Sequence, residues 1–194
     1  GHTSDIRSFL QLADGRLASG SSDKTIRIWS TSTGQCEKVL EGHTSYVISV
    51  IQLADGRLAS GSCDKTIRIW STSTGQCEKV LRGHTNAVVS VIKLVDGRLA
   101  SGSYDKTIRI WSTSTGQCEK VLRGHTSAVW SVIQLVDGRL ASGSNDKTIR
   151  IWSASTGQCE KVLQGHTSYV RSVIQLADGR LASRSVDETI RIWS

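Results

Sequence analysis

The sequence has 194 residues, of which 38% are hydrophobic and 21% are charged, with 18 Gly and no Pro. This composition is too apolar for a disordered chain and lacks the proline of a linker or a collagen. Lys and Arg exceed Asp and Glu by 24 to 17, a net charge of +7. No apolar run approaches the ~18 residues of a membrane span, and the N-terminus does not resemble a signal peptide. We expect a soluble, folded protein. Its lack of Met, even at position 1, indicates a processed, excised or engineered segment.

The triplet Gly-His-Thr recurs every 41 residues, and this period governs how the whole chain is interpreted. The triplet begins at positions 1, 42, 83, 124 and 165. It divides the chain into four complete copies, 1–41, 42–82, 83–123 and 124–164, and a truncated fifth copy, 165–194. We therefore expect a single domain, 1–194, built from five equivalent units.

Each copy predicts four β-strands, described here for copy 42–82. Tyr46–Leu53 is rich in β-branched residues and leads to Asp55-Gly56, a strong hairpin signal. A second strand, Arg57–Ser62, turns and returns as a third, Thr66–Ser71. After a polar, Gly-containing loop, Gln76–Leu81 forms a fourth extended run.

The third strand of each copy indicates how the copies pack. Ile67 and Ile69 face one side of the sheet, whereas Arg68 and Trp70 face the other. No copy shows a helical period, so the units cover one another sheet on sheet, and radial packing is the natural solution. We predict an all-β fold of five four-stranded antiparallel meanders, the fifth without its outer strand.

A resemblance to a known family follows from these motifs. The order Gly-His, Leu-Ala-Ser-Gly-Ser-x-Asp, Thr-Ile-Arg-Ile-Trp resembles the WD40 repeat in all five copies. The resemblance implies a β-propeller, with the Trp-bearing strand third from a central channel. The near-identity of the copies is similar to recently amplified WD40 arrays, and a consensus design would have the same pattern.

The resemblance also implies a hydrogen-bonded tetrad of His, Ser, Asp and Trp in each copy. The matching residues are His2, Ser19, Asp23 and Trp29; His43, Ser60, Asp64 and Trp70; His84, Ser101, Asp105 and Trp111; His125, Ser142, Asp146 and Trp152; and His166, Ser183, Asp187 and Trp193. The residue after Trp is Ser in every copy, where the family usually has Asp.

The same residue types are the parts of a hydrolase triad, but a triad is needed once and a structural network once per unit. We therefore predict no enzymatic activity. The five His cannot converge on one zinc ion, and we expect no metal or cofactor.

No Cys-x-x-Cys occurs, and Cys36, Cys77, Cys118 and Cys159 recur at the repeat spacing with Cys63 elsewhere. Free thiols in a reducing cytosol are expected.

We do not expect nucleic acid as a partner despite the net positive charge. The basic residues recur as regularly as the acidic ones, which favours a solvated surface over a phosphate track. Only Lys24, Lys65, Lys106 and Lys147 form a basic ring, and Glu188 interrupts it.

Variation between the copies is the informative functional signal, because 28 of the 41 positions are identical in every available copy. Three positions change chemistry freely. The fifth reads Asp5, Tyr46, Ala87, Ala128, Tyr169; the seventh reads Arg7, Ile48, Val89, Trp130, Arg171; the twenty-second reads Ser22, Cys63, Tyr104, Asn145, Val186. Strand alternation and strand direction place all three at one end of each unit, which in the family is the top face.

Two functions follow from this pattern. The first is a binding scaffold that presents a diversified top face to a protein or peptide, with Tyr46, Tyr104, Trp130 and Tyr169 as anchors and Arg7 and Arg171 as charge partners. The second is a structural array without a ligand, because surface positions also tolerate change.

Assembly is a further expectation. WD40 propellers usually have about seven blades, and neither terminus supplies the strand that the fifth unit lacks. An open arc would expose apolar faces on the first and fifth units. We expect a chain that self-associates or forms one segment of a larger propeller.

Overall fold

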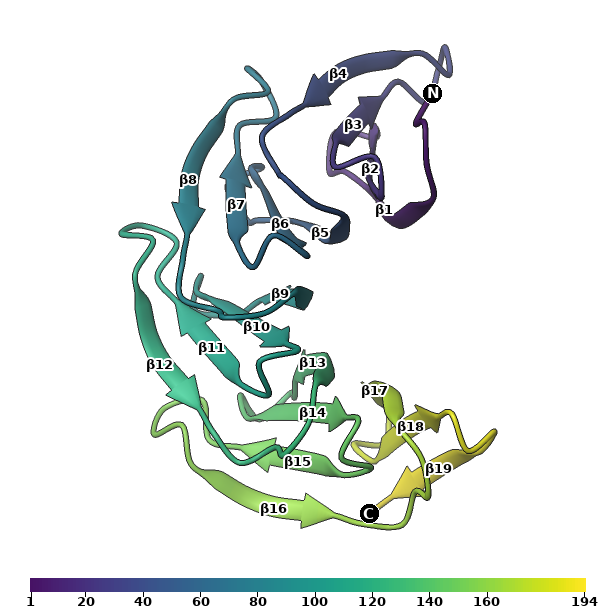
Figure 1. The fold of residues 1–194 in the computed structure, drawn as a ribbon, viewed down its shortest axis with the longest axis vertical. Coiled ribbons are helices and arrows are strands. Elements are labelled where there is room, and N and C mark those ends of the chain that lie inside the picture. Colours follow the sequence, from purple (N-terminus) through teal and green to yellow (C-terminus); the bar gives the residue numbers. More distant parts are fainter.

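β-Strands make up all the regular structure of the computed structural model, which describes residues 1–194 (Figure 1). The innermost strands are β1 (Ile6–Gln11), β5 (Val47–Gln52), β9 (Val88–Lys93), β13 (Val129–Gln134) and β17 (Val170–Gln175). The second strands are β2 (Leu17–Ser21), β6 (Leu58–Ser62), β10 (Leu99–Ser103), β14 (Leu140–Ser144) and β18 (Leu181–Ser185). The third strands are β3 (Ile26–Trp29), β7 (Ile67–Trp70), β11 (Ile108–Trp111), β15 (Ile149–Trp152) and β19 (Ile190–Trp193). The outer strands are β4 (Cys36–Leu40), β8 (Cys77–Leu81), β12 (Cys118–Leu122) and β16 (Cys159–Leu163).

These strands form five antiparallel sheets in simple meander order, four with four strands and the last, β17-β18-β19, with three. We call the sheets blades 1 to 5 in chain order. The predicted fold class is confirmed, and the predicted strand ends in copy 42–82 differ from the observed ones by one residue at most positions. The structure has no helix that is long and apolar enough to cross a membrane.

The turns differ from the prediction in their geometry. The Asp55-Gly56 hairpin is a three-residue loop, 54–56, closed by a hydrogen bond from Leu53 N to Arg57 O of 2.8 Å, with Gly56 at φ +85°. The next turn, 63–65, has the same form, but a lysine occupies the left-handed position: Lys65 lies at φ 71°. A side chain there costs roughly 1–2 kcal/mol. Asp64 offsets this cost, since its Oδ1 accepts the backbone N–H of Thr66 at 2.9 Å.

The hydrophobic core lies between the blades. Ile26 and Ile28 of β3 are fully buried, and they form one cluster with Val47 and Val50 of blade 2 and with Trp70. Equivalent clusters fill the other three junctions. The isoleucines and the tryptophan of a third strand therefore face opposite neighbours, as their alternation predicts.

A β-bulge interrupts the regular alternation of side chains in the first strand of every blade. The pairing register of β5 with β6 shifts between Val47 and Ser49. Val47 and Val50 consequently lie on the same face, three residues apart, although a regular strand would place them on opposite faces. In blade 2 the seventh position, Ile48, is the extra residue of this bulge, and the fifth, Tyr46, lies just before it, so strict alternation is the wrong reason for their proximity.

The five blades form an open arc whose ends do not meet (Figure 1). The outer faces of the two end blades are exposed to solvent. On blade 1, Ile6 is 57% and Phe9 is 75% exposed; on blade 5, Ile190 is 72% and Ile192 is 49% exposed. The matching isoleucines in blades 1 and 2 are fully buried.

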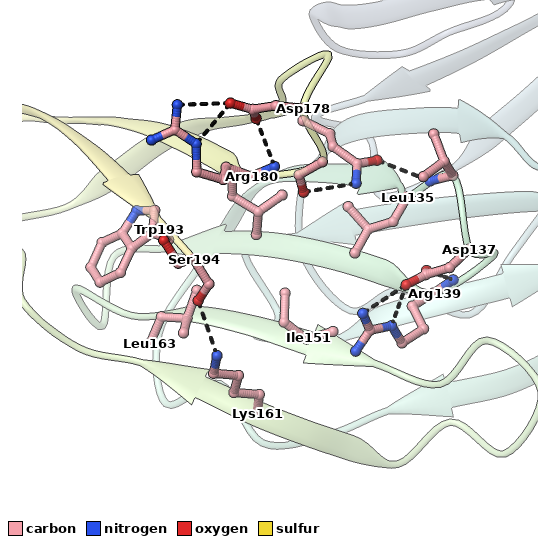
Figure 2. Close-up of a pocket in the computed structure, with 14 residues that line it drawn as sticks. Leu135, Asp137, Arg139, Ile151, Lys161, Leu163, Asp178, Arg180, Trp193 and Ser194 are labelled. Carbon is pink, nitrogen blue, oxygen red and sulfur yellow. Dashed lines mark hydrogen bonds and ion pairs between the residues drawn. The ribbon is translucent and has the colours of Figure 1, made fainter.

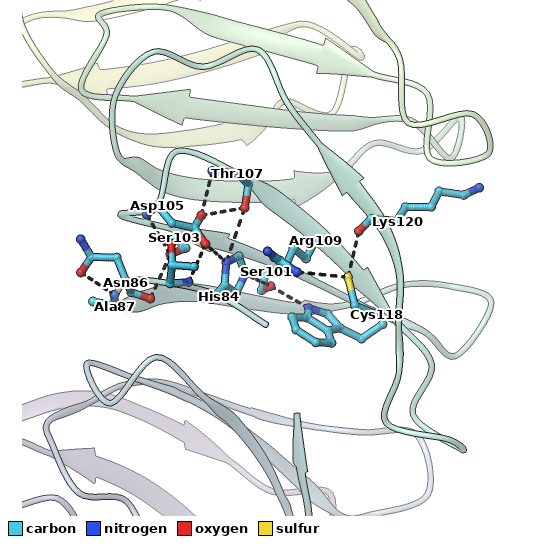
Figure 3. Close-up of polar contacts among 12 residues, drawn as sticks. His84, Asn86, Ala87, Ser101, Ser103, Asp105, Thr107, Arg109, Cys118 and Lys120 are labelled. Atoms are coloured by element: carbon cyan, nitrogen blue, oxygen red, sulfur yellow. Dashed lines mark hydrogen bonds and ion pairs between the residues drawn. The ribbon is translucent and has the colours of Figure 1, made fainter. Parts of the chain in front are cut away.

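Each blade also contains a buried polar network, which Figure 3 shows for blade 3. His84 Nδ1 donates to Asp105 Oδ2 at 2.6 Å, Ser101 Oγ donates to His84 Nε2 at 2.8 Å, and Trp111 Nε1 donates to Ser101 Oγ at 2.8 Å. We assign the donors from the partners, because Asp105 can only accept and the indole can only donate. The same three contacts occur in the other blades at 2.7–2.8 Å.

A threonine that the sequence analysis missed completes this network. Thr107 Oγ1 and its backbone N–H both donate to Asp105 Oδ1, at 2.6 and 3.0 Å. Every blade repeats the pair of bonds. The signal was present in the sequence, since Thr follows each tetrad Asp by two residues without exception.

The network holds its carboxylates ionised. Burial alone would raise the pKa of Asp105, but hydrogen bonds from His84 and Thr107, the proximity of His84 and the backbone N–H of Thr85 outweigh it. The pKa of Asp105 is therefore held far below its usual range, and the other four tetrad aspartates shift in the same direction. Burial lowers the pKa of His84, against the raising effect of Asp105. His84 is thus neutral at pH 7.

The first prediction concerns the tetrad. Trp70→Ala should destabilise the protein by about 3–5 kcal/mol, because the indole is fully buried and its loss leaves a cavity and removes one of the two hydrogen-bond partners of Ser60 Oγ. His2→Ala should cost less than His84→Ala, since Trp29 has no preceding blade over it and Trp111 is fully buried. Urea unfolding of the three variants measures these losses. Equal losses for the two histidine variants would contradict the difference assigned to blade 1.

The second prediction concerns acid. A carboxylate whose pKa is lower in the folded than in the unfolded state stabilises the fold above the unfolded pKa of about 3.9, and this stability is lost as the pH falls below it. The neutral His84 acts in the same direction. The urea midpoint should therefore fall steeply below about pH 4, and Asp105→Asn should lower it at pH 7 while flattening its dependence on pH. A midpoint that is the same at pH 3 and pH 7 would contradict the assignment.

Candidate functional site

The three variable positions of each copy meet at one end of the blade, which we call the top face. In every blade the backbone N–H of the twenty-second position donates to the carbonyl of the fifth; in blade 2 this is Cys63 N to Tyr46 O at 2.9 Å. The seventh position lies at the adjacent bulge. Side chains that are 15 to 17 residues apart in the sequence are thereby neighbours.

An aromatic cluster with one arginine spans blades 3 to 5 on the top face. The guanidinium carbon of Arg171 lies 3.8 Å from the Trp130 ring centroid and 5.7 Å from that of Tyr169. Tyr104 meets Trp130 edge-on, with centroids 4.8 Å apart. We call Tyr104, Trp130, Tyr169 and Arg171 the aromatic cluster; its members come from three blades, so only the tertiary structure brings them together.

Hydrogen bonding fixes the orientation of the central ring in this cluster. Trp130 Nε1 donates to Asn145 Oδ1 at 2.6 Å, which joins the seventh and twenty-second positions of blade 4. Burial raises the pKa of Tyr104, although the charge of Arg171 opposes this effect, so Tyr104 is a neutral phenol at pH 7. Arg171 forms no ion pair with any carboxylate of the chain. Its charge is therefore available to an acidic group from outside.

Blade 1 carries a smaller polar site on the same face. Arg7 Nε donates to Ser22 Oγ at 2.8 Å, and Arg7 Nη2 lies 3.0 Å from Asp5 Oδ2. In contrast to Arg171, Arg7 already has a carboxylate partner. Burial raises the pKa of the neighbouring Cys63 thiol, which therefore stays protonated at neutral pH.

Exposure divides the fifteen predicted top-face residues into unequal groups. Tyr46, Tyr169 and Val186 are 42–50% exposed, and Asp5 and Arg7 are also exposed. The half-buried group comprises Ile48, Cys63, Val89, Tyr104, Trp130, Asn145 and Arg171. Ser22, Ala87 and Ala128 are buried: Ser22 is covered by Arg7, and the two alanines have short side chains at a position where tyrosine is exposed in blades 2 and 5.

Variation is not confined to the top face. Val95 and Val136 occupy the loops at the opposite end, where the other copies have Ala, and both are 91% exposed. These two changes are conservative and involve no polar or aromatic group. The opposite end also carries Lys93, where the other copies have Gln, and Ala154, where the other complete copies have Thr, but none of its positions varies as widely as the three on the top face.

The largest cavity, of 560 Å³, also lies away from the top face. Figure 2 shows it between blades 4 and 5, bounded by Trp193 and Ser194 and by the loops that carry Asp137 and Asp178. Its charged groups are already paired, Arg139 with Asp137 and Arg180 with Asp178, and Lys161 Nζ donates to Ser194 O. No unpaired group converges on the cavity, so we do not assign it a ligand.

The remaining cationic side chains are distributed evenly. The arginine of each first loop pairs with the aspartate two residues before it and, in blades 1 to 4, with a glutamate of the outer strand; Arg57 lies 2.7 Å from Asp55 and 3.2 Å from Glu78. All five cysteines are free and half-buried. No group of three or more His, Cys, Asp or Glu side chains is arranged to hold a metal ion.

Comparison with known proteins adds the family. The model of the WD domain, G-beta repeat, matches residues 1–30, 34–71, 75–112, 116–153 and 157–194. Among solved structures, the WD40 β-propeller domain of Doa1 superposes with a TM-score of 0.88 at 29% sequence identity. The alignment covers 100% of this chain and 65% of that one, so this chain spans about two thirds of the length of its structural relative. No curated protein sequence matches significantly.

The family model spans nearly the entire sequence, and each match after the first begins just before the outer strand of one blade and ends just after the third strand of the next. The structural superposition covers the complete arc. WD40 propellers are in general non-enzymatic scaffolds for protein interaction. The chain belongs to the WD40-repeat family of β-propellers.

Proposed function

We propose that this protein is a non-enzymatic scaffold that binds a protein or peptide through its top face. One observation carries the proposal: five nearly identical backbones differ in chemistry where their side chains gather at one end. Trp, Tyr and Arg are the residue types that most often dominate the binding energy of interfaces. The aromatic cluster supplies all three within one contiguous group.

The geometry of the cluster suits a peptide that carries a carboxylate. Arg171 stacks on Trp130 and has no acidic partner within the chain, so its guanidinium can donate to a carboxylate of a ligand. The half-buried rings restrict the conformations of Tyr104 and Trp130 before binding, which lowers the entropy cost of association. An acidic side chain flanked by an apolar one is the ligand that these features favour.

Burial argues against a catalytic use of the tetrads. Their Ser–His–Asp arrangement has the contacts of a triad, but Ser101 is fully buried and its Oγ also accepts a hydrogen bond from Trp111. A nucleophile needs an accessible oxygen and donors for the developing oxyanion. The tetrad has neither, and we propose that it is structural. The free thiols are consistent with a reducing compartment.

The third prediction tests the top face with substitutions that other blades already tolerate. Trp130→Val, Arg171→Ile and Tyr104→Asn each introduce the residue found at the same position in another copy. Peptides selected from a random displayed library on the natural protein should bind the triple variant at least tenfold more weakly, with a change in stability of about 1 kcal/mol or less. Isothermal titration calorimetry and urea unfolding measure the two quantities.

The matched control for this test is Val95→Ala with Val136→Ala. These changes are at the opposite end and also introduce the residue found in other copies. These changes should leave peptide affinity unaffected. Selection of no peptide, or equal binding to the natural protein and the triple variant, would refute the proposal and favour the structural array without a ligand.

Assembly is the second proposal, and the exposed apolar faces of blades 1 and 5 favour it. Soluble monomers rarely leave such patches uncovered. We propose that these faces dock either on a second copy or on further blades of a larger propeller.

The fourth prediction concerns this assembly. Light scattering across a tenfold concentration range should give an average mass that rises above the 21.0 kDa of one chain. A constant monomer mass would refute self-association of this sequence and leave only the larger propeller.

A further inference from the structure

A glycine in the second strand of blades 1 to 4 lies in close contact with the next blade. A Cβ atom on Gly20, Gly61, Gly102 or Gly143 would lie 2.7–3.1 Å from methyl carbons of the two valines on the next blade. Gly20 meets Val47 and Val50, and Gly143 meets Val170 and Val173. Real Cβ atoms do not approach this closely, so the contact between blades needs glycine.

Blade 5 has Arg184 at this position, and it is the only copy without glycine. Arg184 lies on β18 next to Ile190 in the sheet register and is exposed to solvent. Its side chain therefore stands on the face that a following blade would have to cover.

The outer faces of blades 5 and 1 otherwise match each other as internal neighbours do. Ile190 and Ile192 correspond to the isoleucines that are buried at every internal junction. On blade 1, an apolar hollow of 240 Å³ lined by Ile6, Phe9, Leu17 and Trp29 corresponds to the surface that receives them. A second copy of the chain thus presents the complementary face.

The polar contacts of the internal junctions also have counterparts at the two ends. Val173 N donates to Ser131 Oγ at 3.2 Å, and Val136 N donates to Gln175 Oε1 at 2.9 Å. At a junction between copies, the equivalent acceptors are Ser172 of one copy and Gln11 of the other. Arg184 and the larger side chains of Ile6 and Phe9 are the departures from the internal pattern.

We propose that Arg184 limits the head-to-tail docking of a second copy by occupying the place that the internal contact reserves for glycine. The obstacle matters because such docking is heterologous: a face of one kind binds a face of another kind. Unless the rotation closes, contacts of this type continue into open filaments. The inference rests on the self-association surface proposed above and not on the top face.

The obstacle is both steric and electrostatic. The Cβ of Arg184 alone would clash with the side chains at positions 6 and 9 of the next copy, by the spacing at Gly143. The guanidinium would also be enclosed among Ile6, Phe9, Ile190 and Ile192, and an unpaired buried charge is strongly unfavourable.

The fifth prediction compares two variants by sedimentation velocity. Ile6→Val with Phe9→Val gives blade 1 the internal valines but keeps Arg184; adding Arg184→Gly completes the internal contact. Both variants carry only residues found in the other copies, so they should fold. We expect the triple variant to self-associate at a concentration at least tenfold lower than the double variant or the natural protein.

Two controls make the result specific. Glu188→Lys also restores the residue of the other copies in blade 5, but in the loop, and should not promote association. Adding Phe9→Asp to Arg184→Gly should abolish the self-association that Arg184→Gly promotes, because the aspartate places a charge on the apolar face of blade 1. Equal association of the double and triple variants overturns the role of Arg184, and association that Phe9→Asp leaves intact overturns the head-to-tail geometry.

Discussion

The contact between neighbouring sheets is the constraint on which the rest of this structure depends. Two isoleucines on one blade meet two valines and a tryptophan on the next, and a glycine lets the backbones approach. No blade buries its apolar side chains by itself, since the core lies between the sheets. Stability is therefore shared along the array, as in other repeat proteins, and the end blades retain one uncovered face each.

The polar network inside each blade stabilises the tryptophan that packs at this contact. The indole of the tetrad forms part of the junction with the preceding blade, so its N–H is buried and needs an acceptor. Hydrogen bonds continue from this indole through Ser and His to the Asp of the strained turn. There the carboxylate accepts four hydrogen bonds, two of them from Thr107. One network thereby fixes the tryptophan and the left-handed lysine turn together. It resembles a catalytic triad because both need an oriented imidazole, and it differs because the hydroxyl is enclosed.

A uniform scaffold of this kind leaves the top face free to vary. The fifth, seventh and twenty-second positions lie at a bulge and a turn, outside the four hydrophobic clusters, so they change without disturbing the junctions. Arg184 shows the opposite case. It changes a junction position, on the blade where no internal neighbour meets it, and the energetic consequence falls on association with another chain instead of on folding.

The sequence indicates the repeat, the strands and the meander order, because each is a local pattern that recurs five times, and its resemblance to the WD40 family supplies the members of the tetrads. It did not reveal the three-residue loops, the left-handed lysines or the bulge at Val47, since several backbone conformations suit the same residues until hydrogen bonds to neighbouring strands select one. Only the tertiary structure placed Trp130, Arg171 and Tyr104 in contact, because they come from three blades and their contact depends on the angle between blades. The arrangement of the blades also decides whether position 184 faces solvent or a pair of valines. Packing between the sheets sets this arrangement, and local sequence patterns do not encode it.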